Sequence, residues 1–169
     1  MSLANRVHIR RRFLRSIRID DDLNNPDAID GFVCPHSSAQ ILLTMARHVS
    51  ETGQGAFTWT GPYGSGKSSL VVVLSALLAG SQKQQRHARS IFGREIVTPI
   101  RKAMPTAKQG LQIIPVVGRR DNPVSVIGDA LQTAGVVDKA PKGGWTESAV
   151  LKAIKETLSS GGSLILFVD

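Results

Sequence analysis

Cysteine is almost missing from this 169-residue chain, since Cys34 is the only one. A single cysteine excludes an internal disulfide, and the four histidines are scattered without the spacing of a zinc site. Aromatic residues make up 5% of the chain and are not interleaved with basic ones, as they are in proteins that stack single-stranded bases. No uncharged apolar run reaches the roughly 18 residues of a membrane span, and the arginine-rich start lacks the apolar core of a secretory signal. We therefore predict a cytoplasmic protein.

The composition is that of one soluble globular domain, with 41% hydrophobic and 20% charged residues. The net charge of +8 is concentrated in two basic stretches. Such stretches can follow the phosphate backbone of a nucleic acid, but charge runs more often solvate a face or meet an acidic protein. The first contains Arg6, Arg10, Arg11, Arg12, Arg15 and Arg18, followed by Asp20 to Asp22; the second contains Lys83, Arg86, Arg89, Arg94, Arg101, Lys102 and Lys108, with Glu95 as its one acid.

The chain divides into a basic arm and a domain. Residues 1–30 have little periodic apolar pattern, so we predict a poorly ordered arm there and a folded domain over residues 31–169. Apolar residues recur at helical spacing over residues 37–49, with Ser37 or Ser38 as the N-cap. A further helix is expected over residues 85–104, with breaks or kinks at Gly93 and Pro99. Another is expected over residues 123–134, with Asp121 or Asn122 as its N-cap and Pro123 in its first position, and a last one over residues 147–159.

Three short runs have β-type composition. Residues 56–60 (AFTWT) are aromatic and β-branched, and residues 111–117 (LQIIPVV) are similar, although Pro115 favours an edge or irregular position. Residues 163–169 read as a continuous buried strand that ends on a carboxylate. Because these runs alternate with helices, we predict an α/β fold with a mostly parallel sheet and flanking helices.

The motif with chemical content is GPYGSGKS at residues 61–68, which matches G-x-x-x-x-G-K-[ST], the P-loop. Glycines let many backbone N–H groups converge on a polyphosphate, and the positive end of the following helix adds a favourable field. The apolar run over residues 69–79 must be that helix, with Gly80 at its end. We predict that the chain binds a nucleoside triphosphate, ATP with Mg²⁺, through Gly61, Pro62, Tyr63, Gly64, Ser65, Gly66, Lys67, Ser68 and Ser69.

Two side chains of this motif have defined roles. Lys67 is expected to reach the β- and γ-phosphates, and the Ser68 hydroxyl to bind magnesium. Asp169 ends an apolar strand and is predicted as the second magnesium ligand, directly or through water. Lys67 and Asp169 are therefore the candidate catalytic residues, and Ser68 and Asp169 the candidate metal ligands. Buried strands also end in aspartate for turn reasons, so the role of Asp169 depends on the P-loop upstream.

The order of these elements resembles the P-loop ATPases of the AAA+ and STAND kind, found in large prokaryotic ATP-binding proteins. Gly31-Phe32-Val33 looks like the short box that packs near the base, and residues 163–169 look like the Walker B strand. The resemblance covers about residues 31–169, and its specific part is Walker A. In those families the strand after Walker B lies between the Walker A and Walker B strands. The resemblance thus implies a sheet that is incomplete after Walker B, an N-terminal portion of a larger protein, and poor hydrolysis by this chain alone.

Three functional hypotheses remain open. The first is the N-terminal part of an ATP-driven motor or switch that acts on nucleic acid or protein. The second is a nucleotide-dependent module that contacts nucleic acid through its basic arm and does no hydrolysis. The third is part of a GTPase or small-molecule kinase, although the Asn-Lys-x-Asp element of guanine recognition is absent from residues 1–169.

Overall fold

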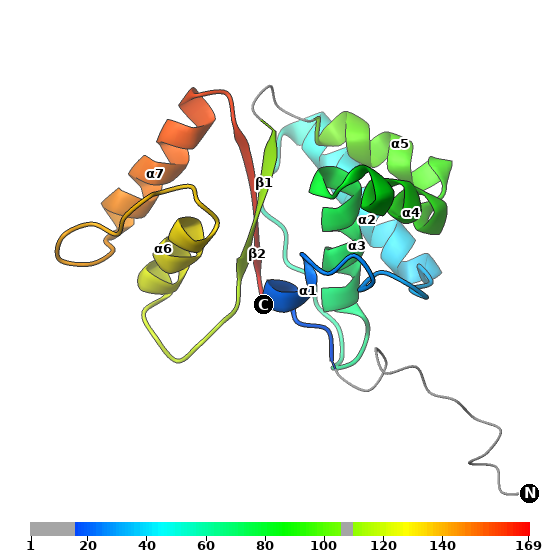
Figure 1. Ribbon diagram of the computed structural model, residues 1–169. Helices are drawn as coiled ribbons and strands as arrows, with labels where there is room; N and C mark the ends of the chain where they lie inside the picture. The colour runs from blue at the N-terminus through cyan, green and yellow to red at the C-terminus, as the bar shows by residue number, and fades with distance from the viewer. Residues whose placement is uncertain (1–15, 106–109) are drawn as a thin grey trace, which may run out of the picture.

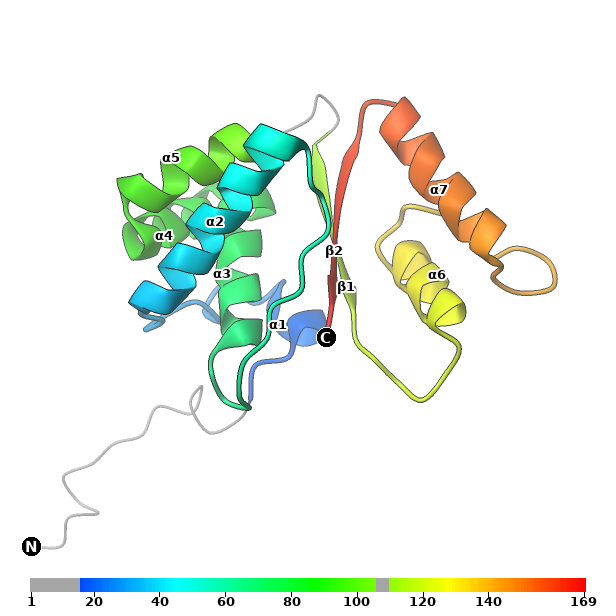
Figure 2. The ribbon, with the colours of Figure 1, turned by 180° about the vertical axis from the view of Figure 1, so that it is seen from behind.

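The computed structural model describes residues 16–105 and 110–169. These residues form a mixed α/β fold with two parallel strands, β1 (Leu111–Val116) and β2 (Ser163–Val168). One group of helices covers one face of this sheet and a second group covers the other (Figure 1, Figure 2). The first group is α2 (His36–Thr52), α3 (Lys67–Ala79), α4 (Gln82–Phe92) and α5 (Arg94–Ala103); the second is α6 (Pro123–Thr133) and α7 (Glu147–Ser159); and the short α1 (Ile19–Asp22) lies beside α3 and the sheet.

The two layers of helices enclose separate hydrophobic clusters, and β2 contributes to both. Ile165 and Phe167 pack against the cluster of α2 to α5, whereas Leu164 and Leu166 pack against the cluster of α6 and α7. The sequence predicts a buried strand here, yet residues 163–167 are half-buried and Val168 is 70% exposed. The prediction is wrong because one edge of β2 has no neighbouring strand among the described residues.

Local sequence signals explain several helices. Nine consecutive residues of α3, from Leu70 to Leu78, are buried, which is why this helix is apolar on every side. It ends at Gly80, as predicted. Asn122 caps α6, which begins with Pro123, and the Thr146 hydroxyl accepts a hydrogen bond from the Ala149 amide at the start of α7. No helix in the described part of the chain is long and apolar enough to cross a membrane.

Other local predictions are wrong. Residues 56–60 form no strand, although their exposure alternates as it does in a strand. Phe57 and Trp59 are half-buried, and residues 56, 58 and 60 are exposed. Helix α2 begins directly after Pro35, without a serine side chain as its cap. Gly93, with φ 73°, divides the basic helix into α4 and α5, as expected, but Pro99 lies inside α5 without ending it.

Part of the stretch expected to lack a fold is packed on the core. Ile19, the first residue of α1, and Ile29 are each 1% exposed. The buried carboxylate of Asp22 accepts a hydrogen bond from the Arg18 amide at 3.0 Å. The arginines predicted to form a basic arm, apart from Arg18, lie outside the described residues.

Gly128 in α6 leads to a first testable prediction. A methyl group added at this buried position would overlap the indole ring of Trp145, whose Nε1 donates to Asp129 at 3.1 Å. We expect Gly128→Ala to lower the free energy of unfolding by about 1–3 kcal/mol, because overpacking exceeds the gain of roughly 1 kcal/mol in helix propensity. Chemical denaturation monitored by tryptophan fluorescence measures this change. Thr133→Ala, at an exposed position of the same helix, is the control, and an equal or higher stability of Gly128→Ala would contradict the prediction.

Candidate functional site

Residues 61–66 form the turn that leads into α3. Gly64 and Gly66 have φ angles of 77° and 83°, in the left-handed region that side chains with a Cβ avoid. A Cβ at either glycine would contact nothing, so the backbone conformation, and not the space, requires glycine there. Gly66 is the residue before α3, and the first turn of that helix presents N–H groups without partners inside the helix. The turn thus holds the positive end of a buried helix toward solvent.

Lys67, the first residue of α3, folds back over the turn. Its Nζ donates to the carbonyl oxygens of Gly61 at 3.0 Å and Pro62 at 3.1 Å, and lies 3.4 Å from Ser65 Oγ. These acceptors are neutral, so the ammonium group has no carboxylate partner in the described structure. The charge of Lys67 is available to an anion at this position without breaking an ion pair.

Ser68 and Asp169 are in direct contact although 101 residues separate them. Ser68 Oγ donates to Asp169 Oδ2 at 2.9 Å. Two backbone hydrogen bonds fix Asp169: its amide donates to Val116 O at 2.9 Å, and its carbonyl accepts from Gly118 N at 2.6 Å. The parallel pairing of β1 and β2 therefore brings the end of the chain, with Asp169, to the N-terminal end of α3 (Figure 1).

These two side chains supply few ligands for a cation. Within the described residues, no group of three or more His, Cys, Asp or Glu side chains is placed to hold a metal ion. Mg²⁺ commonly binds one or two protein oxygens and completes its six ligands with phosphate oxygens and water. Ser68 Oγ and Asp169 Oδ2 fit that pattern, provided a phosphate is bound on the turn.

A cleft of about 780 Å³ lies over the turn. Its other wall is the segment before α2, and Ser16 Oγ lies 3.3 Å from the hydroxyl of Tyr63 across it. Phe32, predicted to lie near a base, lines the cleft, whereas Val33 does not line it and is 80% exposed. This wall has no signal in the sequence, because its apolar residues, Ile17 among them, are too few to form a periodic pattern.

The charge of this cleft is mixed. Asp22, Asp27, Asp30 and Asp169 line it, and Lys67 is the one lysine or arginine among the described residues of its lining. His87 Nδ1 lies 3.2 Å from the carboxylate of Asp30. The carboxylates would repel a polyphosphate in this cleft, and a divalent cation would reduce that repulsion.

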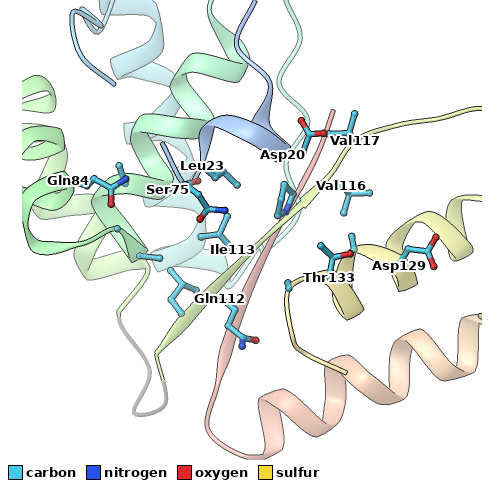
Figure 3. A pocket seen from close by; sticks show the side chains of 18 of the residues that line it. Asp20, Leu23, Ser75, Gln84, Gln112, Ile113, Val116, Val117, Asp129 and Thr133 are labelled. Carbon is cyan, nitrogen blue, oxygen red and sulfur yellow. The ribbon is translucent and has the colours of Figure 1, made fainter. Parts of the chain in front are cut away.

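A second cavity of about 760 Å³ lies along β1, between α3 and α4 on one side and α6 on the other (Figure 3). It is separate from the turn at residues 61–66. Its charged groups are paired: Asp129 contacts Arg119, and Asp20 contacts Arg18. Arg119 also lies 3.6 Å from Asp121, so this arginine at the end of β1 is tied to its own loop and to α6.

Apart from Lys108, which lies outside the described residues, the second basic stretch forms an exposed surface on α4 and α5. Arg89 and Arg101 both donate to Gln85 Oε1, at 3.5 and 2.9 Å, and burial together with the charge of Arg89 lowers the pKa of Arg101. Arg101 also donates to Leu77 O at 3.3 Å, which gives it a structural role at the end of α3. Nucleic-acid binding by either basic stretch stays a prediction.

The surroundings of Cys34 favour the protonated thiol. Burial raises the pKa of its thiol, and Sγ lies 3.7 Å from the carbonyl oxygen of Pro35. A raised pKa keeps the group in the weakly reactive thiol form at neutral pH.

Comparisons with protein-family models, with curated proteins and with solved structures found no match to this chain.

Proposed function

We propose that this chain binds a nucleoside triphosphate, ATP with Mg²⁺, in the cleft over the N-terminus of α3. The contact between Ser68 Oγ and Asp169 Oδ2 carries the proposal. Ser68 belongs to the P-loop motif, and Asp169 is a carboxylate at the end of a strand downstream of that motif. Two oxygen atoms 2.9 Å apart are close enough to be neighbouring ligands of one magnesium ion.

Three further features support phosphate binding at this position. The glycines provide the backbone conformation of a phosphate-binding turn, the N-terminus of α3 provides N–H donors, and Lys67 provides a charge with neutral partners. In the proposed complex Lys67 leaves the carbonyls of Gly61 and Pro62 and contacts the β- and γ-phosphates. Phe32 lines the same cleft and offers an apolar contact for the base.

Titration with ATP, ADP, AMP and adenosine tests this proposal. Because the P-loop contacts the terminal phosphates, we expect ATP with Mg²⁺ to bind about 100-fold or more tightly than AMP, the difference that a few hydrogen bonds to charged groups provide. Isothermal titration calorimetry measures the four dissociation constants. Equal affinity for ATP and AMP would contradict binding through the turn, and a preference for GTP over ATP would favour the GTPase hypothesis.

A further inference from the structure

The lysines and arginines of α4 and α5 have no carboxylate partners in the described part of the chain. All of them are exposed, and none forms an ion pair with a described residue. The one acid of the two helices, Glu95, has its carboxylate beside Gly93, at the turn between them. Asp30 contacts α4 through His87, not through a lysine or an arginine. This surface therefore carries uncompensated positive charge, from Lys83, Arg86, Arg89, Arg94, Arg101 and Lys102.

Two of these guanidinium groups, on different helices, meet at one neutral oxygen. Arg101 Nη2 donates to Gln85 Oε1 at 2.9 Å, and Arg89 Nη2 donates to the same atom at 3.5 Å. The Gln85 amide is itself fixed, because its Nε2 donates to Gly80 O at 2.8 Å. Burial and the nearby charge of Arg89 lower the pKa of Arg101. Two like charges are thus held close together without a counter-ion, and an anion beside them would be attracted by both.

Arg101 is held in place and still has donors to offer. Its Nη2 bonds to Leu77 O at 3.3 Å and to Gln85 Oε1, whereas its Nε and Nη1 form no hydrogen bond with a described residue. A side chain that is already ordered loses less conformational entropy when it binds a ligand. The planar fork of guanidinium N–H groups matches the oxygens of a phosphate. Arg89 and Arg101, which we call the arginine pair, are therefore suited to bind a phosphate group.

The other residues on this surface indicate the kind of partner. The one aromatic residue of the two helices, Phe92, is 2% exposed, so no ring is available to stack single-stranded bases. No large apolar side chain of α4 or α5 is exposed, whereas protein interfaces centre on apolar or aromatic anchors. The apolar faces of both helices pack in the cluster of α2 to α5, so they cannot insert into a membrane. Exposed neutral side chains of a type that hydrogen-bonds phosphates are Gln82, Ser90 and Thr98.

We propose that the surface of α4 and α5 binds double-stranded nucleic acid through its phosphates, and that the arginine pair holds one of these phosphates. The two helices lie side by side on the outer side of the first helix group (Figure 1, Figure 2). A duplex carries one negative charge per about 1.7 Å of its axis, and α4, with 11 residues, is about 16 Å long. The surface can therefore contact several phosphates. Phosphate contacts carry no sequence information, so we expect binding that does not depend on base sequence.

This surface is separate from the proposed nucleotide site. Arg101 contacts Leu77, which lies about 15 Å along the axis of α3 from Lys67. The inference therefore does not depend on nucleotide binding. A wild-type chain that binds a duplex but not ATP would refute the proposed function and leave the inference about α4 and α5 intact.

Fluorescence anisotropy with labelled nucleic acids tests the surface. The probes are DNA and RNA duplexes of about 20 base pairs, in two unrelated sequences, and one DNA strand of the same length. We expect equal affinity for the two sequences and weaker binding of the single strand, which has a lower charge density. Between about 50 and 200 mM salt, the logarithm of the association constant should fall linearly with the logarithm of salt concentration, by roughly 0.9 per phosphate neutralised. The DNA and RNA duplexes show which backbone is preferred.

Two double variants separate the arginine pair from overall charge. The first is Arg89→Gln with Arg101→Gln. The matched control is Lys139→Gln with Lys142→Gln, which removes two charges from the exposed loop before α7, on the other face of the sheet. We expect the first variant to bind the duplex about tenfold or more weakly and to lower the salt slope by roughly 1–2. The control should change duplex affinity by less than about threefold, and both variants should keep the ATP affinity of the wild type.

A third variant guards against a folding defect. Arg101→Gln also removes the hydrogen bonds to Leu77 and Gln85, so circular dichroism is used to check that the protein is folded. Arg86→Gln with Arg89→Gln changes α4 alone and leaves those two bonds in place. This variant should also bind the duplex more weakly than the lysine control, by about fivefold.

Three results would overturn the proposal. The first is equal duplex affinity in the arginine variants and the lysine control. The second is duplex binding that is lost only when Arg10, Arg11 and Arg12 are neutralised, because the basic arm would then hold the duplex. The third is the absence of saturable duplex binding by the wild type, or tighter binding of the single strand. Binding to phosphatidylserine vesicles or polyglutamate without binding to a duplex would instead identify a membrane or an acidic protein as the partner.

Discussion

Lys67→Ala is expected to weaken binding of ATP with Mg²⁺ by about 100-fold, since hydrogen bonds between charged groups contribute roughly 1.5–3 kcal/mol each. In the described structure Lys67 Nζ contacts the carbonyl oxygens of Gly61 and Pro62, both neutral. Transfer of this ammonium group to the phosphates exchanges neutral acceptors for anionic ones, which is why the expected loss is large.

The choice of control separates this local role from the overall positive charge. Lys83→Ala removes the same charge from an exposed position of α4 and does not line the cleft. It should leave the affinity for ATP unchanged within about twofold, because solvent and salt screen distant charges. Lys67→Arg keeps the charge but changes its shape and reach, so we expect it to recover only part of the affinity. Calorimetric titrations that give equal dissociation constants for Lys67→Ala and Lys83→Ala would refute the assigned role of Lys67.

Removal of either Ser68 Oγ or the Asp169 carboxylate is expected to abolish most of the magnesium dependence of ATP binding. In the wild type, Mg²⁺ should strengthen ATP binding by about tenfold or more, since the cation offsets repulsion between the phosphates and the carboxylates of the cleft. Ser68→Ala removes one ligand. Asp169→Asn removes a negative charge that would bind Mg²⁺ and would also repel the phosphates. The affinity of this variant for ATP without Mg²⁺ should therefore rise, while the gain in affinity from Mg²⁺ disappears.

The double variant determines whether the two residues act on one ion. If Ser68 and Asp169 hold the same cation, the two losses will not add, and a double-mutant cycle will show a coupling of about 0.5–3 kcal/mol. Asp138→Asn, in the exposed loop before α7, controls for the change in charge. Titration of ATP at fixed concentrations of Mg²⁺ and in excess chelator supplies the four affinities. A magnesium effect that persists in both single variants would count against the shared site.

Much of the fold follows from local signals in the sequence. The motif at residues 61–68 indicates both a turn and the helix after it, although the valines of α3 alone would suggest a strand. Asn122 before Pro123, and Thr146 at the start of α7, mark helix ends through bonds to amides two or three residues away. Such interactions lie within one turn of the chain, so sequence spacing is sufficient to predict them.

Predictions failed where the outcome depends on distant partners. Residues 56–60 have the composition of a strand, but a strand also needs a neighbour for its backbone groups, and composition does not reveal whether a neighbour is present. The burial of Ile19 and Ile29 depends in the same way on surfaces formed by residues far along the chain.

By itself, the sequence determined the turn at residues 61–66, for which we propose phosphate binding, and the positions of most helices, because glycine conformations, caps and apolar periodicity act over a few residues. Only the tertiary structure decided that Ser68 and Asp169 touch, since the parallel pairing of β1 and β2 closes a separation of 101 residues. It also decided which edge of the sheet is open. Pro115 and Leu166 both lie in apolar runs. The parallel pairing directs the backbone of each residue away from the neighbouring strand, and only Leu166 has an N–H group there.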